Sequence, residues 1–172
     1  MGTPPGRRRP RRAGRATSDA DRRRLAKASG RRANSIPPPP AAAGPVAWCD
    51  GGSRGNPGPS AYAYLIESAD GRLLAEHAEP IGFATVNVAE YRGIIAALER
   101  AAQLGLPAVE VRMDSRLVVQ QLLGLWTVRS PHLRRLHELA LEAASQLDLV
   151  GYRWVPREQN ARADALVAAV LT

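Results

Sequence analysis

Four acidic residues lie where they could share metal ions, because each stands at the end or the start of a predicted element. Asp50 and Asp114 end two predicted strands, whereas Glu90 and Asp164 fall in the first turns of two predicted helices. Carboxylates without a histidine or cysteine ligand suit hard cations such as Mg²⁺ or Mn²⁺. Two such ions about 4 Å apart can act on both the attacking and the leaving oxygen of a phosphodiester. The four acids therefore predict a centre for two Mg²⁺ ions, with Mn²⁺ as a substitute.

Each acid also has an explanation that involves no chemistry. Glu90 fits the third position of a helix that Asn87 would cap. Asp114 could cap the helix that follows it, and Asp164 could interact favourably with a helix dipole. Asp50 is harder to explain in this way, because it is in phase with the apolar residues of its strand and should face the interior.

The rest of the pattern predicts the elements that position these acids. Alternating apolar residues predict strands, and apolar residues three or four positions apart predict helices. The order is βββαβααβα, an α/β fold that has a mixed five-stranded sheet (three antiparallel strands, then two parallel ones) and helices on both faces. The predicted strands are 46–50, 61–67, 72–81, 109–113 and 149–155, and the predicted helices are 87–105, 115–123, 131–147 and a last one from Asn160.

The net charge of +8 combines two parts that differ in character. Residues 1–45 hold eleven Arg, one Lys and two Asp, a net charge of +10, whereas residues 46–172 hold twelve Arg and fourteen acids, a net charge of −2. Residues 1–45 have almost no large apolar side chains, so the sequence predicts a disordered Arg- and Pro-rich tail before a folded catalytic domain. The tail could hold nucleic-acid phosphates in any sequence. Alternatively, it is a solvated extension or the product of an upstream start codon.

Composition excludes several other classes of protein. No apolar stretch approaches the about 18 residues that a membrane span needs. The basic N-terminal residues are not followed by the apolar segment of a secretory signal. Cys49 is the only cysteine, which excludes an intrachain disulfide and a cysteine metal cage. The single cysteine fits a reducing compartment, so we expect a cytoplasmic protein. We also expect it to associate with the nucleoid, to be a monomer and to have no membrane partner.

Four motifs in this order resemble those of type 1 ribonuclease H. They are CDGGSRGNPGP at 49–59, NVAEY at 87–91, MDS at 113–115, and WVPREQNARAD at 154–164. Each contributes one acid, and the resemblance covers residues 46 to about 170. It implies the ribonuclease H fold, which has the order of elements given above. It also implies an endonuclease that hydrolyses the RNA strand of RNA/DNA hybrids with two metal ions, leaving 5′-phosphate and 3′-hydroxyl ends.

The resemblance also assigns roles to residues. Asp50 is similar to the carboxylate that bridges both metals, Glu90 and Asp114 would complete the site nearer the leaving group, and Asp164 the site nearer the attacking water. Glycines beside Asp50 would let a duplex backbone approach closely. Asn56 could contact a 2′-hydroxyl or a base edge of the RNA, or could simply be a turn residue. The expected substrate contacts are Gly51, Gly52, Ser53, Arg54, Asn56, Thr85, Asn87 and Arg116.

Several positions depart from the family pattern. Val86 replaces a frequent Asn, Arg116 replaces a frequent Gln, and only six residues connect two helices where longer members carry a basic helical handle. The mobile histidine that many members have in the loop after Trp154 is absent. Arg157 stands in that loop and is a fifth expected catalytic residue. These features resemble the short, archaeal-like branch of the family. The three histidines lie away from the motifs and are expected to have surface roles: His77, His132 and His137.

Two other functions compete with this one. An exonuclease of the same fold would carry a Tyr or His near its last acid, and Arg157 and Arg162 do not supply one. A non-catalytic module that binds hybrids or duplex RNA would not need all four acids. Catalysis on RNA/DNA hybrids is therefore preferred. Double-stranded RNA is a second expected substrate, because Val86 and the missing handle leave fewer contacts to the partner strand.

Overall fold

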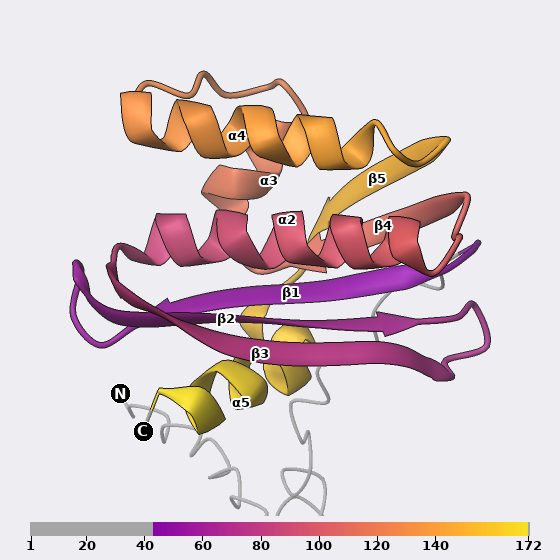
Figure 1. Cartoon of the computed structure of the whole chain (residues 1–172), viewed down its shortest axis with the longest axis horizontal. Helices are drawn as coiled ribbons and strands as arrows, with labels where there is room; N and C mark the ends of the chain where they lie inside the picture. Colours follow the sequence, from indigo (N-terminus) through magenta and orange to yellow (C-terminus); the bar gives the residue numbers. More distant parts are fainter. Residues whose placement is uncertain (1–42, 172) are drawn as a thin grey trace, which may run out of the picture. The chain divides into compact units, whose positions relative to one another are not determined.

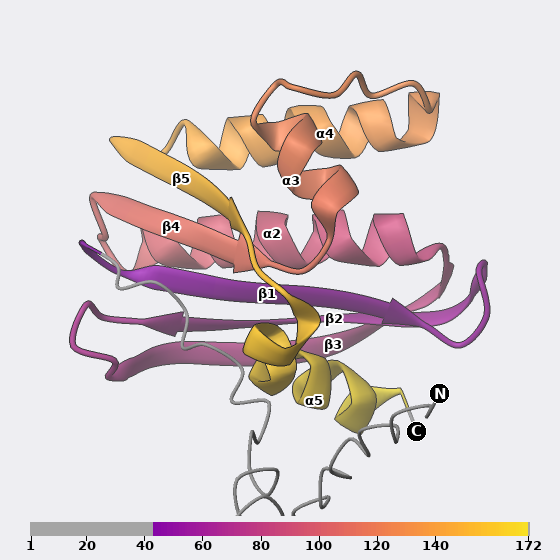
Figure 2. The ribbon, with the colours of Figure 1, turned by 180° about the vertical axis from the view of Figure 1, so that it is seen from behind.

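In the computed structural model, residues 43–171 are described, and they form one mixed sheet with helices on both faces (Figures 1 and 2). Labels follow Figure 1. The strands are β1 (Val46–Ser53), β2 (Gly58–Glu67), β3 (Leu73–Ala84), β4 (Ala108–Met113) and β5 (Leu149–Trp154). The helices are α2 (Val86–Gln103), α3 (Arg116–Leu122), α4 (Pro131–Ala144), the 3₁₀ helix η1 (Arg157–Asn160) and α5 (Ala161–Val170).

The central strand of the sheet is β1, and the strand order is β3-β2-β1-β4-β5. The strands β1, β2 and β3 pair in antiparallel fashion, with Val46 opposite Glu67 and Ser53 opposite Ser60. The strands β4 and β5 then continue the sheet parallel to β1, and Trp48 lies beside Arg112. This arrangement confirms the predicted fold class, with three antiparallel strands and then two parallel ones.

The helices cover the sheet unequally. The helix α2 lies against β1 and β2, and α4 packs on α2 on the side away from the sheet, whereas α5 covers the opposite face (Figures 1 and 2). Alternation along β1 directs Ala47 and Cys49 into the main core, where they meet Tyr91 and Ile94 of α2. On the other face, Val167 of α5 packs against small residues of β2. The sheet is therefore held between two helical layers that both reach β1.

Two predicted details of the local structure are wrong. The strand β1 runs to Ser53, so Asp50 lies within the strand and not at its end. The helix α2 begins at Val86 because Thr85 is its N-cap, and the Thr85 hydroxyl accepts a hydrogen bond from Val88 N. Asn87 is therefore the second residue of the helix and not its cap, and Glu90 is the fifth and not within the first turn.

The predicted disordered tail at 1–45 falls almost wholly outside the described residues. Within the described part of the chain, no helix has the length and apolar character needed to cross a lipid bilayer.

Candidate active site

Three of the four predicted acids meet at the centre of the sheet. Asp50 lies in β1 with 5% of its surface exposed, Glu90 lies in α2 and is equally buried, and Asp114 directly follows β4 and is half-buried. One carboxylate oxygen from each lies within 4.8 Å of the other two. This spacing allows a single cation to contact all three side chains.

Backbone packing explains how the chain brings these acids together. The strands β1 and β4 are parallel neighbours, so Asp50 in β1 lies beside the end of β4, which Asp114 directly follows. Gly51 then allows α2 to approach, because a Cβ atom on Gly51 would lie 2.2 Å from the backbone nitrogen of Glu90. Gly51 is itself buried, so the structure gives this glycine a packing role, and Gly52 similarly packs against Val167 of α5.

The electrostatics of the centre disfavour ionisation of all three carboxylates when no cation is bound. Burial, with the nearby charges of Asp114 and Asp164, raises the pKa of Asp50 to about 7. Burial and the charge of Asp50 raise the pKa of Glu90 well above its usual range. Arg157 acts in the opposite direction on both groups. Like charges held this close in a buried place favour protonation, unless a cation is present.

The donor set fits a hard divalent cation. The converging atoms of the three acids are all carboxylate oxygens, the ligands that Mg²⁺ and Mn²⁺ prefer. In addition, Glu90 Oε2 is buried and has no hydrogen-bond partner within residues 43–171. A buried acceptor without a donor is costly, and a metal ion would satisfy it.

Asp164 lies apart from the three converging acids. It occupies the first turn of α5, and its Oδ1 accepts a hydrogen bond from Arg157 Nη2 in a salt bridge. Arg157 is 72% exposed and Asp164 is 40% exposed, so the pair is open to solvent. Arg157 therefore neutralises the acid that the sequence assigns to the second metal position.

Asn160 is a site residue that the sequence-based prediction missed. It is 1% exposed, and its Nδ2 donates to the carbonyl oxygen of Cys49 at 2.8 Å and to Asp114 Oδ1 at 3.0 Å. The side chain was expected only to open the last helix. Its only sequence signal was its place between Arg157 and Asp164 in the fourth motif.

The loop after β1 is hydrogen-bonded to the start of α2. Arg54 N donates to Pro59 O at 2.8 Å, and Asn56 Oδ1 accepts from Val86 N at 3.2 Å. Thr85 precedes this nitrogen and caps the helix. The hydrogen bond to Val86 therefore brings the predicted contacts Asn56 and Thr85 close to each other.

The remaining predicted contacts spread around this centre. Ser53 donates from its hydroxyl to the carbonyl oxygen of Ala84, which joins the ends of β1 and β3. Asn87 is half-buried in the first turn of α2, and Arg54 is exposed in the loop. Arg116 is exposed at the first position of α3, two residues after Asp114.

The histidines lie outside the acidic centre, as the motifs predict. His77 is exposed on β3 and pairs with Glu79. His132 is exposed at the start of α4. The surface role expected for His137 is only partly met, because this half-buried ring packs edge-on against Tyr91 and contacts the carbonyl oxygen of Gln121.

Comparison with known proteins agrees with this geometry. Residues 48–170 match a family model described as "Reverse transcriptase-like". The Ribonuclease HI of Halobacterium salinarum is 47% identical over 125 residues, which cover 73% of this chain and 63% of that protein. The structure of LC11-RNase H1 in complex with an RNA/DNA hybrid has a TM-score of 0.70 and 37% identity, and the match covers 74% of this chain and 96% of that one.

A mycobacterial relative is much longer than the matched region. The "Bifunctional protein Rv2228c" of Mycobacterium tuberculosis is 51% identical over 122 residues, which cover 70% of this chain but 34% of that protein. The chain thus corresponds to about a third of that relative.

Proposed function

Because the chain belongs to the type 1 ribonuclease H family, we propose that it is an endonuclease that hydrolyses the RNA strand of RNA/DNA hybrids. One observation supports this proposal above the others. Three carboxylates converge within 4.8 Å, those of Asp50 in β1, Glu90 in α2 and Asp114 directly after β4. Asp50 and Glu90 are buried, and Glu90 Oε2 has no hydrogen-bond partner among residues 43–171. Burying carboxylates so close together costs free energy unless they bind cations, and core packing does not require them.

Asp50, Glu90, Asp114 and Asp164 would hold two Mg²⁺ ions, with Mn²⁺ as a substitute. When bound, the ions lower the pKa of a water molecule and stabilise charge on the leaving oxygen. Asp50 converges with Glu90 and Asp114, and the charge of Asp164 also raises its pKa, so this carboxylate interacts with the acids of both proposed metal positions. We therefore propose that Asp50 would contribute a ligand to both metal positions.

Arg157 would act beside Asp164 at the open side of the centre. Its guanidinium keeps its charge at neutral pH, so it cannot serve as a general base. It can hold Asp164 in place before metal binds and then attract the scissile phosphate. This role accounts for a salt bridge that is largely exposed and therefore contributes little to folding stability.

The loop at 53–57 and the start of α2 would hold the RNA strand. Asn56 and Thr85 present polar groups next to each other, and a 2′-hydroxyl is the group by which a protein can distinguish RNA from DNA. The solved structure of LC11-RNase H1 contains an RNA/DNA hybrid, which supports a hybrid as the substrate of this fold. Gly52, Ser53, Arg54, Asn87 and Arg116 complete the proposed contact surface, whereas the expected contact Gly51 is buried and acts through packing.

Water is the proposed nucleophile, and the 3′ oxygen of the ribose leaves. The products would carry 5′-phosphate and 3′-hydroxyl ends. We also propose that the protein cleaves double-stranded RNA more weakly than hybrids. It would act as a monomer in the cytoplasm, associated with the nucleoid. The basic residues 1–45 would add phosphate contacts that do not depend on sequence.

Purified protein tested on labelled RNA/DNA, RNA/RNA and DNA/DNA duplexes with Mg²⁺ would decide the proposal. We expect hybrid cleavage to dominate, double-stranded RNA to be cut slowly, and double-stranded DNA to remain intact. EDTA and Asp50→Asn should each abolish cleavage, whereas hybrid binding should persist in the variant. Binding without cleavage by the parental protein would instead favour a non-catalytic hybrid-binding module. Products with cyclic 2′,3′-phosphate ends would contradict the water mechanism.

A further inference from the structure

Trp154, the last residue of β5, is hydrogen-bonded to the backbone of one of the acids. Its indole Nε1 donates to the carbonyl oxygen of Asp114 at 3.1 Å. The side chain is 45% exposed, although tryptophan is highly buried on average, so packing alone does not account for it. In the sequence, Trp154 only opens the fourth motif, and its residue type suggests no chemistry.

Asp114 lies in a bend between β4 and α3, outside both elements. The last carbonyl oxygen of β4, that of Met113, accepts a hydrogen bond from Val155 N at 2.9 Å. At the start of α3, the carbonyl oxygen of Ser115 accepts one from Val119 N at 3.1 Å. The backbone hydrogen bonds of the sheet and of the helix thus reach the residues on either side of Asp114, whose own carbonyl oxygen is bonded by a side chain.

The segment that follows β5 contacts Asp114 a second time. In Figure 2 this segment passes the end of β4 on its way to α5. It carries Asn160, whose Nδ2 donates to Asp114 Oδ1 at 3.0 Å. The two contacts differ in what they hold, because Trp154 bonds the peptide of Asp114 and Asn160 bonds its carboxylate. Together they restrain both ends of this side chain from one short stretch of the chain.

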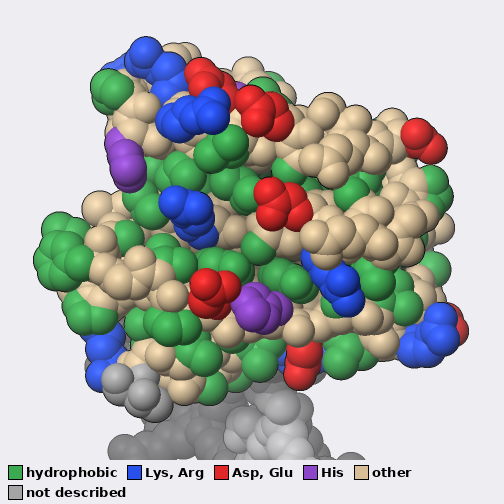
Figure 3. Space-filling view, viewed as in Figure 1, with side chains coloured by type: hydrophobic (Ala, Val, Ile, Leu, Met, Phe, Trp, Pro, Cys, Tyr) green, Lys and Arg blue, Asp and Glu red, His purple; other side chains and the backbone are tan. Residues whose placement is uncertain are grey.

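Both donors are uncharged, which suits a carboxylate that must bind a cation. Among residues 43–171 no salt bridge involves Asp114, whereas Asp164 is paired with Arg157. A guanidinium group on Asp114 would compete with a metal ion, but an indole or amide N–H orients the group without adding a positive charge. On the face seen in Figure 3, basic and acidic side chains also alternate and form no continuous basic patch. Neutral hydrogen bonds are therefore the contacts that orient Asp114.

From these contacts we infer that Trp154 is a positioning residue, which fixes the peptide of Asp114 and so directs its carboxylate towards the metal position before a cation binds. A ligand whose orientation is already fixed loses less conformational freedom on binding. Groups that hold a metal ligand from outside the coordination sphere tune metal affinity in this way. The inference rests on the proposed function, and it gives the exposed indole a purpose that packing does not.

Titration of the full-length chain with Mg²⁺ in a calorimeter, without substrate, tests the inference. Trp154→Phe keeps an aromatic ring but has no N–H to donate. We expect its Kd for Mg²⁺ to rise about threefold to tenfold, the effect of losing one hydrogen bond. At limiting Mg²⁺, kcat on the hybrid should fall by a similar factor and should recover at saturating Mg²⁺, with KM for the hybrid unchanged. Added metal would not restore turnover lost through damaged packing.

The matched control is Trp126→Phe, which changes a 48% exposed tryptophan in the connection between α3 and α4. It should bind Mg²⁺ as the parent does. The same Trp154→Phe change is also made in an Asn160→Ala background. There its effect on the Kd should shrink to less than about twofold, because residues that act through one shared group are not additive and Asp114 is already released. Thermal unfolding shows whether each variant is folded.

Trp154→Leu, which also lacks a donor, serves as a second variant and should weaken Mg²⁺ binding in the same way. A Kd equal to the parental value in the folded Phe or Leu variant would overturn the inference and leave the proposed function standing. An undiminished effect of Trp154→Phe in the Asn160→Ala background would do the same. A parental protein that binds no Mg²⁺ or cleaves no hybrid would overturn both.

Discussion

Asn160 Nδ2 lies 3.0 Å from Asp114 Oδ1 and, at the same time, 2.8 Å from the carbonyl oxygen of Cys49. One buried amide therefore connects the loop before α5 with β1 and with the acid that follows β4. The Asn160 oxygen itself has no hydrogen-bond partner among the residues that the structure describes. This asymmetry indicates a side chain selected for its donor group, which fixes a carboxylate next to Asp50.

Asn160→Ala should therefore impair metal binding more than substrate binding. We expect the half-saturating Mg²⁺ concentration to rise and kcat to fall about tenfold, with KM for the hybrid little changed, because Asp114 loses the donor that orients it. Asn160→Asp should be worse, since it places an acceptor against two others. The control is Gln121→Ala, which removes another buried amide, the one bonded to Tyr91. If Asn160→Ala and Asn160→Asp reach half-saturation at the same Mg²⁺ concentration as the parent, Asn160 has only a structural role.

Gly51→Ala should destabilise the fold strongly. The added methyl group would lie 2.2 Å from the Glu90 nitrogen, and backbone cannot yield as a flexible side chain can. We expect the free energy of unfolding to decrease by about 1–3 kcal/mol. Gly44→Ala is the control, because a Cβ atom there would meet nothing within 4 Å. Denaturant unfolding of both variants measures the difference, and similar midpoints would contradict the proposed packing of α2 on β1.

The stability of the metal-free protein should depend on pH in a defined direction. The pKa of Asp50 is raised from 3.8 to about 7 in the folded state, so folding favours the protonated form. Stability from this group is fully present below pH 3.8 and is lost as the pH rises through about 7. Asp50→Asn should therefore stabilise the metal-free protein at pH 8 but change little at pH 4.

Mg²⁺ should reverse that loss, because a bound cation stabilises the ionised carboxylates. We expect Mg²⁺ at ten times its Kd or more to raise the melting temperature at pH 8 and to have little effect at pH 4. At ten times the Kd, the free energy of unfolding at pH 8 should increase by about 1.4 kcal/mol. Thermal unfolding at both pH values, with and without the metal, measures this. A metal effect of equal size at both pH values would argue against ligation by Asp50 and Glu90.

Arg157→Ala should lower turnover more than affinity. The variant frees Asp164 from its salt bridge but also removes the charge that would attract the scissile phosphate. Arg157→Lys should recover part of the turnover, because it keeps the charge and loses only the guanidinium geometry. Steady-state kinetics on the hybrid separates kcat from KM. Normal turnover in Arg157→Ala would remove this residue from the mechanism.

Deletion of residues 1–40 should leave the chemistry intact and weaken duplex binding. These residues carry eleven Arg, one Lys and two Asp, and they precede a domain with a net charge of −2. Loss of so many cations should flatten the slope of log affinity against log salt concentration. Binding titrations at several salt concentrations measure the slope, and an unchanged slope would show that the segment takes no part in binding.

The sequence by itself determined the order of the elements and the identity of the acids. Alternation along β1 and the three-to-four spacing along α2 are local patterns, and they predict both elements without any knowledge of their neighbours. The four motifs then assigned one acid to each of four segments. Three of those acids indeed converge. Asp50 lies beside the end of β4, which Asp114 follows, and Gly51 lets the helix that carries Glu90 approach β1.

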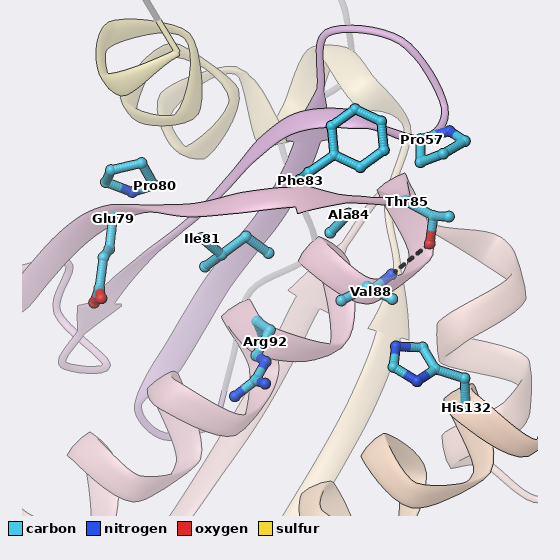
Figure 4. A pocket seen from close by; sticks show the side chains of 10 residues that line it. All are labelled: Pro57, Glu79, Pro80, Ile81, Phe83, Ala84, Thr85, Val88, Arg92 and His132. Atoms are coloured by element: carbon cyan, nitrogen blue, oxygen red, sulfur yellow. Dashed lines mark hydrogen bonds between the residues drawn. The ribbon is translucent and has the colours of Figure 1, made fainter.

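Only the tertiary structure decided how these residues are held. Asn160 lies 111 positions from Cys49 in the chain, and no local pattern records a hydrogen bond over that separation. The prediction that Asn87 caps α2 was wrong for a related reason. Thr85 and Asn87 are both residue types that cap helices, so the sequence does not distinguish them. The path of the backbone at the end of β3 makes Thr85 the cap. A groove of about 710 Å³ likewise arises where Phe83, at the end of β3, and His132, at the start of α4, line one cavity (Figure 4). Propensity acts over a few residues, whereas side-chain partners and cavities depend on how whole elements pack.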